Sequence, residues 1–218
     1  MKDKACFLSQ SVKVTGLGGE SFGHSMAALK EICQTGERQF KEGKLQQWSP
    51  EYVQGFEVVD VSNRYFRLKV KSAEDTGIEL VQEIDPNSIL RGMANNMLIH
   101  MDDNVVHYYK ATMDNGKNEV SRYSKARPQI FRVGNVVEVQ FSIAFIKARN
   151  TTTRMKLVLR AVAMVDCQHA MNADREKKRM AIEARELKLT TRMKRKIGFE
   201  DEDKDEEEES RSQEGPGK

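Results

Sequence analysis

The sequence predicts a mainly β protein with flanking helices, an α+β fold class, and three observations support this prediction. Apolar and polar residues alternate with a period of two within residues 56–84 and 105–165, which is typical of half-buried antiparallel strands. Turn signals such as the Asp-Asn-Gly run at 114–116 separate these segments. Helical spacing of apolar residues occurs instead in residues 21–43, 86–97 and 171–199.

The N-terminal part contains one or two short helices, expected within residues 21–43. Residues 1–20 are polar and glycine-rich, and we expect them to form a flexible lead. Phe22, Met26, Leu29 and Cys33 share one helical face within residues 21–43. Pro50 then favours a connector, because the residue before a proline avoids the helical region.

Six strands and a short helix are expected in the rest of the domain, which spans residues 21–170. The strands are placed at residues 56–61, 65–71, 78–84, 105–113, 136–148 and 154–165. Asp85 and Pro86 are suited to the start of a helix between the third and fourth strands. This order indicates an antiparallel OB-like β-barrel. A generic α+β sheet with helices on one face is the competing architecture.

The charge is distributed unevenly along the chain. Residues 200–218 hold ten acids and three bases, a net charge of −7, so a total of +3 leaves +10 on residues 1–199. Residues 171–199 read as a basic helix, with ten bases and three acids between Arg175 and Lys196. Residues 200–218 have the composition of a disordered acidic tail. Such asymmetry favours a polyanionic partner with which the tail competes, although a tail that only adds solubility is the plain alternative.

Several classes of protein are disfavoured by the composition. Three cysteines are widely spaced, no Cys-x-x-Cys pair occurs and four histidines are scattered, so we expect neither a metal site nor a disulfide framework. No signal-peptide pattern and no apolar run near 18 residues is present, and we expect no membrane association. The protein is therefore expected to be intracellular, and the basic run at 192–196 favours the nucleus over the cytoplasm.

A glycine-rich loop raises the possibility of nucleotide binding. "GGESFGHS" (18–25) has the length of a phosphate-binding loop, but His24 stands where a lysine is needed. Glu20 would repel a phosphate, and no parallel βαβ crossover is expected after the loop. We interpret the loop as a linker at the start of the first helix. No other catalytic motif is found, so we expect no enzyme, no catalytic residues and no cofactor.

Aromatic and basic residues on shared strand faces predict single-stranded nucleic-acid binding. Such sites combine a cationic groove with aromatic rings on which bases stack. In residues 65–71, Tyr65 lies on the same strand face as three basic residues, Arg67, Lys69 and Lys71. The candidate binding residues are Arg64, Tyr65, Arg67, Lys69, Lys71, Tyr108, Lys110, Arg122, Arg149, Arg154, Lys156 and Arg160. The competing interpretation is that the tyrosines pack inside and the lysines are merely solvated.

Three stretches suggest a family. "ESFGHSMAALKEICQTGE" (20–37), "WSPEYVQGF" (48–56) and "FRVGNVVEVQFSI" (131–143) resemble a family of small proteins of mushroom-forming fungi. The resemblance covers about residues 20–166 and excludes the basic helix and the acidic tail. The family has no assigned activity, so the resemblance implies a eukaryotic intracellular protein and no catalytic residues.

The function that follows is a non-enzymatic module that binds single-stranded nucleic acid and is regulated by its acidic tail. The alternative is a protein-interaction or chromatin-associated scaffold whose tail binds a basic protein partner. Deleting residues 200–218 separates the two, because it should strengthen oligonucleotide binding in the first case and abolish partner binding in the second.

Overall fold

The computed structural model describes residues 2–69, 77–94, 97–113, 120–148 and 152–187. The chain divides into two compact units, residues 1–166 and residues 167–218. The described strands all belong to the first unit, with helices α1 and α2 and the 3₁₀-helices η1 (Lys2–Phe7), η2 (Asp102–Asn104) and η3 (Pro128–Ile130). The fold is therefore mainly β with a few helices, which confirms the expected α+β class.

Two long antiparallel strands, β9 (Val136–Lys147) and β10 (Thr153–Asp166), form the centre of the larger sheet. Because β9 occupies one edge of β10 along its length, β2 (Leu45–Gln46) and β7 (His107–Met113) pair with the other edge, both in parallel. β7 continues the sheet to β8 (Val120–Lys125) through an antiparallel pairing. β8 and β9 are thus at opposite margins, with β7 and β10 between them.

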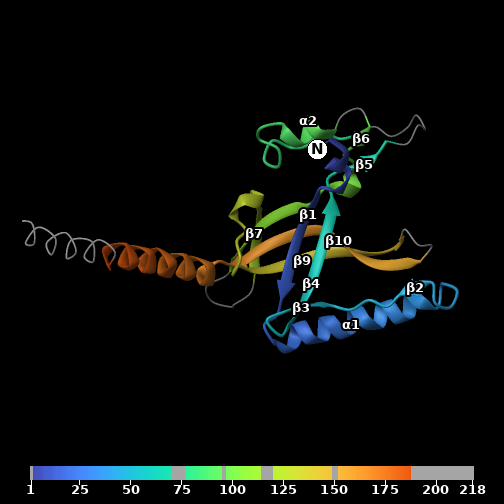
Figure 1. The fold of residues 1–218 in the computed structure, drawn as a ribbon, viewed down its shortest axis with the longest axis horizontal. Coiled ribbons are helices and arrows are strands. Elements are labelled where there is room, and N and C mark those ends of the chain that lie inside the picture. Colours follow the sequence, from blue (N-terminus) through green and yellow to red (C-terminus); the bar gives the residue numbers. More distant parts are fainter. Residues whose placement is uncertain (1, 70–76, 95–96, 114–119, 149–151, 188–218) are drawn as a thin grey trace, which may run out of the picture. The chain divides into compact units, whose positions relative to one another are not determined.

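A second sheet crosses the first (Figure 1). It consists of β1 (Ser9–Thr15), β4 (Phe56–Arg64) and β3 (Glu51–Val53), and β1 pairs along its whole length with β4. Residues 9–15 fall in the segment that the sequence assigns to a flexible lead, and here the structure differs. Gln10, Val12 and Val14 face inward while the residues between them are exposed, so the segment gains a strand's backbone pairing and a buried face.

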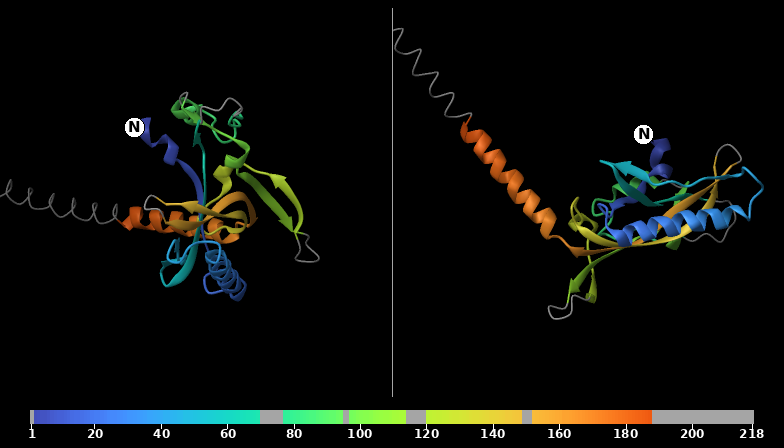
Figure 2. Two further views of the ribbon diagram at one scale, coloured as in Figure 1. Left: turned by 90° about the vertical axis from the view of Figure 1, so that its right-hand side faces the viewer. Right: turned by 90° about the horizontal axis from the view of Figure 1, so that it is seen from below.

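The core lies where helix α1 (Glu20–Glu37) meets both sheets. α1 forms one continuous helix (Figure 2) and buries one face, as the spacing of its apolar residues predicts. The cluster comprises Met26, Leu29, Cys33, Leu45, Val59, Val61, Val106, Met155, Leu157, Leu159 and Val162. Because β10 supplies four of these side chains, that strand holds α1 and β4 together.

A small subregion completes the first unit. β5 (Arg67–Leu68) pairs with β6 (Leu98–Ile99), and α2 (Ile89–Ala94) is a short helix. Both carboxylate oxygens of buried Asp85 accept hydrogen bonds from N–H groups in the first turn of α2, at 3.1 and 2.9 Å. The helix thus begins at Ile89 and not at the expected Pro86, and Asp85 caps it with its side chain from four positions before its first residue.

The described strands do not close into the expected OB-like barrel but form three separate sheets. The strand expected at residues 65–71 is reduced to β5, with residues 70 and 71 outside the described part, and residues 82–84 form a turn where a third strand was expected. Ile78 and Val81 are exposed, so the alternation in that segment is not matched by a buried face. In addition, β2 and β7 join β10 in parallel, whereas an OB barrel is a Greek-key arrangement of mainly antiparallel strands.

The second unit is described over residues 168–187, which are helical. Arg179 pairs with Glu176 at 2.6 Å and with Glu183 at 3.9 Å, the spacing at which side chains meet on one helix face. The predicted basic helix extends to residue 199, and its last part and the acidic tail lie outside the described residues. Among the helices of the described part, none combines the length and apolar character needed to cross a membrane.

Candidate nucleic-acid interface

The glycine loop between β1 and α1 is a tight turn. A Cβ atom at Gly16 would lie 2.2 Å from the Cβ of Phe22, so the residue must be glycine for the helix to pack this closely. Gly18 has a φ of +88°, in the region that favours glycine. Among the described strands β1 pairs with β4, in antiparallel fashion, rather than with a parallel strand following α1. Chain geometry therefore accounts for these glycines without a phosphate ligand.

Three of the candidate cations come together beside β10. Arg64 is the last residue of β4, and Arg154 and Lys156 lie on β10. Burial is the main cause that lowers the pKa of Lys156, and the nearby positive charges of Arg64 and Arg154 lower this pKa further. The Asp60 carboxylate acts in the opposite direction and raises it. We call Arg64, Arg154 and Lys156 the basic cluster. Arg64 and Arg154 are each near enough to Lys156 to disfavour its charge, so an added anion beside Lys156 would relieve this repulsion.

A buried amide holds the basic cluster together. Asn63, next to Arg64, is buried, and its Nδ2 donates to the carbonyl oxygens of Leu159 at 3.1 Å and Asp103 at 2.7 Å. The first of these bonds ties the end of β4 directly to the backbone of β10. Because an unpartnered buried amide would be costly, this bond fixes where β4 meets β10 and therefore where Arg64 lies.

An exposed aromatic ring lies beside the basic cluster. The guanidinium carbon of Arg64 is 5.9 Å from the ring centroid of Phe7, a cation–π distance. The Phe7 side chain is 57% exposed, which is unusual for a phenylalanine. The sequence prediction missed Phe7 because it assigned residues 1–20 to a flexible lead. Phe7 would have been recognised if the pairing of β1 with β4, which brings it near Arg64, had been foreseen.

The two tyrosines expected to stack on bases are half-buried instead. The hydroxyl of Tyr108 donates to Oε1 of Gln10 at 3.2 Å, and its ring packs 5.7 Å from that of Phe131. Burial raises the pKa of Tyr108 to about 12, and burial also raises the pKa of Tyr65. Neither ring is therefore a freely exposed platform.

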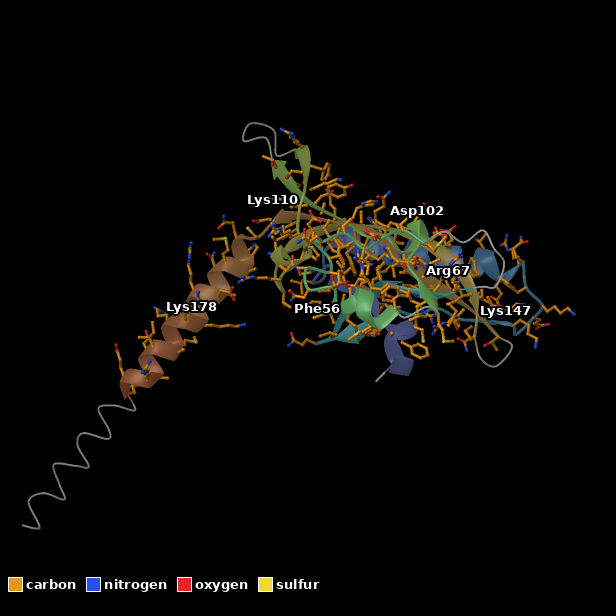
Figure 3. All side chains as sticks on the ribbon, turned by 90° about the horizontal axis from the view of Figure 1, so that it is seen from above. Phe56, Arg67, Asp102, Lys110, Lys147 and Lys178 are labelled. Atoms are coloured by element: carbon orange, nitrogen blue, oxygen red, sulfur yellow. The ribbon has the colours of Figure 1, made fainter. Side chains whose placement is uncertain are left out.

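The other candidates are dispersed over the first unit. Arg160 is engaged by η2, because its Nη1 donates to the carbonyl oxygen of Asp103 at 2.8 Å. Lys110 is on β7 and Arg122 is on its partner strand β8. Figure 3 shows Lys110 away from Arg67 on β5. Lys69 follows β5 and is exposed. Lys71 and Arg149 lie outside the described residues.

No group of three or more His, Cys, Asp or Glu side chains is placed to hold a metal ion within the part of the chain that the structure describes. Comparison of the chain with protein-family models, with curated proteins and with solved structures finds no match. The assignment of a function therefore depends on the geometry of this chain alone.

Proposed function

We propose that this protein is a non-enzymatic module that binds single-stranded nucleic acid, with the basic cluster as its phosphate-binding centre. The observation that carries the proposal is the convergence of Arg64, Arg154 and Lys156 beside the exposed ring of Phe7. Cations that track the backbone and a ring on which a base stacks are the two elements of non-specific single-strand sites. The binding surface proposed here lies where β4 meets β10, in place of the groove of an OB-like barrel.

The electrostatics of the cluster support an anionic ligand. In the described part of the chain, no carboxylate forms an ion pair with any of its three members. Lys156 loses solvation and is repelled by Arg64 and Arg154, and these effects outweigh the attraction of Asp60. A phosphate would compensate both the lost solvation and the repulsion. The charge of +10 on residues 1–199 would add long-range attraction.

The acidic tail is proposed to compete with nucleic acid for these cations. Residues 200–218 carry a net charge of −7, and nine of the ten residues in 200–209 are acidic. A tethered polyanion acts at a high effective concentration, so it weakens binding of an external strand. A chain of residues 1–199 should therefore bind oligonucleotides more tightly than the full chain.

The experiment is a fluorescence-anisotropy titration with a labelled oligo(dT) of roughly twelve nucleotides, a length within the site sizes of small single-strand-binding domains. Affinity is measured at several salt concentrations for the full chain and for R64Q/R154Q/K156Q. The triple variant should bind more weakly, and its log–log salt slope should be shallower by about 2, since each phosphate contact contributes about 0.7.

A matched control removes three charges from the helix of the second unit. Arg175, Lys177 and Lys178 are exposed on this helix. R175Q/K177Q/K178Q should keep the salt slope of the unchanged chain to within experimental error. If both triple variants lose the same slope, binding reflects net charge alone and the basic cluster is not its centre.

A protein-interaction scaffold is the second candidate, favoured by exposed apolar side chains in the β5–β6 and α2 region. Leu68, Ile89 and Met97 are 61%, 56% and 70% exposed. Exposed apolar residues that gather on one region often mark a protein-binding surface. In this case oligonucleotides would be ignored, and deleting residues 200–218 would abolish binding to a basic probe such as purified core histones.

A further inference from the structure

A trough lies on the face of the larger sheet that is opposite the core. It encloses about 550 Å³, and its lining includes Tyr109, Tyr123, Glu138, Gln140, Ala161 and Ala163. Val162, between the two alanines on β10, belongs to the buried core. Because successive side chains of a strand point to opposite faces, Ala161 and Ala163 are directed away from the core. Val139, which also lines the trough, packs against the core, and Ala163 is buried, so the trough lies directly on the back of the packed sheet.

Strand register explains why this face is hollow. Ala163 is paired with Tyr109 on one side and with Glu138 on the other. Ala161 is paired in the same way with His107 and Gln140. A row of small side chains on the central strand is thus flanked by longer ones on both neighbours, and these form the walls of the trough.

The sheet curls around this face. The hydroxyl of Tyr123 on β8 donates to Oε2 of Glu138 on β9 at 2.5 Å, although β7 and β10 lie between these strands. The same bond raises the pKa of Tyr123. The rings of Tyr109 and Tyr123 meet edge to face, with centroids 6.4 Å apart. Two aromatic walls and a carboxylate therefore converge on one space.

Cationic and imidazole groups lie at the margin of this face. Lys125 is paired with Tyr109 across the β7–β8 ladder and is exposed. His107 is also exposed, and its ring is 6.3 Å from that of Tyr109. The trough thus combines aromatic surface, a hydrogen-bond acceptor, an amide and a nearby positive charge, which are the groups that recognise an unstacked nucleotide.

We propose that the trough binds one base of a single strand and prefers guanine, an inference that rests on the proposed function and names its base specificity. The Glu138 carboxylate can only accept hydrogen bonds, and its bond to Tyr123 leaves other acceptor positions open. Guanine presents two adjacent donors, N1–H and N2–H, to such a group. Thymine and uracil present a single N3–H between two carbonyl oxygens, which the carboxylate repels. Adenine and cytosine each offer one amino group.

The remaining lining residues fit the same base. Gln140 carries an amide N–H that can donate to guanine O6, and it lies on the same strand face as Glu138, two positions along β9. Tyr109 and Tyr123 supply the ring surface, and Lys125 is placed for the phosphate of the same nucleotide. The preference thus arises from Glu138, whereas stacking and phosphate contacts are shared by all four bases.

The experiment uses the full chain and labelled oligo(dT) strands of roughly twelve nucleotides with a single dG, dA or dC at the centre. A single guanine per strand prevents guanine-rich self-association. The affinity for the dG strand should be at least about fivefold higher than for all-dT, which is the range expected for one bidentate base contact. E138Q should remove this preference, while E31Q, an exposed glutamate on α1, should keep it.

The two proposals fail in different ways. R64Q/R154Q/K156Q should weaken the binding of all strands and keep the preference for dG. The trough proposal is overturned if the strands bind but the dG strand binds no more tightly than the others. It is also overturned if E138Q keeps the preference for dG. If no strand binds, the proposed function fails, and guanosine 5′-monophosphate is then titrated against the chain by NMR alongside uridine 5′-monophosphate. Selective guanosine binding that E138Q abolishes would support the trough, and equal or absent binding would overturn it. An unchanged urea midpoint for E138Q verifies folding.

Discussion

Two glycines of α1 should respond in different ways to the same substitution. Gly23 lies in the first turn of the helix and Gly36 in the last, so alanine offers each a comparable gain in helix propensity of about 0.5–1 kcal/mol. A Cβ atom at Gly23 meets nothing within 4 Å. A Cβ atom at Gly36 would lie 2.2 Å from Cζ of Phe145 on β9. The comparison therefore isolates the packing of α1 against the sheet.

The magnitude follows from the contact at Gly36. Ordinary carbon–carbon contacts are about 3.5–4.0 Å, so the Phe145 ring must move by more than an ångström. That ring also packs 5.6 Å from the ring of Phe40, and the movement would disturb this contact. Overpacking of this kind costs about 1–3 kcal/mol. We expect G23A to be as stable as the original chain or more stable, and G36A to be less stable than G23A by about 2 kcal/mol.

The assay is urea unfolding followed by the fluorescence of Trp48, the one tryptophan of the chain. Trp48 packs against the hydrophobic core and therefore reports on the first unit. The free energy of unfolding is compared for G23A, G36A and the unchanged chain. If G36A is as stable as G23A, then α1 does not approach β9 through Gly36, and the packing described here is wrong.

Two further predictions concern the interior. Leu159 is fully buried, so L159A should lower the free energy of unfolding by about 2–5 kcal/mol in the same urea assay; a loss below about 1 kcal/mol would contradict its place at the centre of the core. Tyr108 should ionise near pH 12, above the usual value near 10, in an ultraviolet titration, and Y108F should remove that step. Because the folded state holds the Tyr108 proton more tightly, the contribution of Tyr108 to stability is complete below pH 10 and is lost as the pH rises toward 12. Ionisation of all tyrosines near pH 10 would argue against the burial of Tyr108.

Local patterns predicted the elements whose burial follows a single period. The alternation at 136–148 and 154–165 became β9 and β10, and the helical stripe beginning at Phe22 became α1. The alternation at 78–84 did not become a strand, since an alternating pattern needs a second surface to cover its apolar side. The strand at Ser9–Thr15 was missed because its partner, β4, lies far along the chain.

The candidate site shows the same division. The sequence placed Arg64, Arg154 and Lys156 among its candidate binding residues, but it could not group them apart from Arg160 or Lys110. The grouping depends on the bond from Asn63 to the carbonyl oxygen of Leu159, which joins residues 96 positions apart. Phe7 and the Tyr123–Glu138 contact also appear only when the sheets are assembled.

By itself, the sequence determined the α+β class, the uneven charge and the supply of cationic and aromatic side chains, because these depend on composition and on periods of two or 3.6 residues. The tertiary structure alone decided that Tyr65 and Tyr108 are half-buried, that the basic cluster forms beside Phe7 and that Glu138 faces Tyr109 and Tyr123 across a curled sheet. The physical reason is that each of these arrangements requires strands distant in the chain to pair in one register, and pairing is set by the burial of whole faces rather than by any local segment.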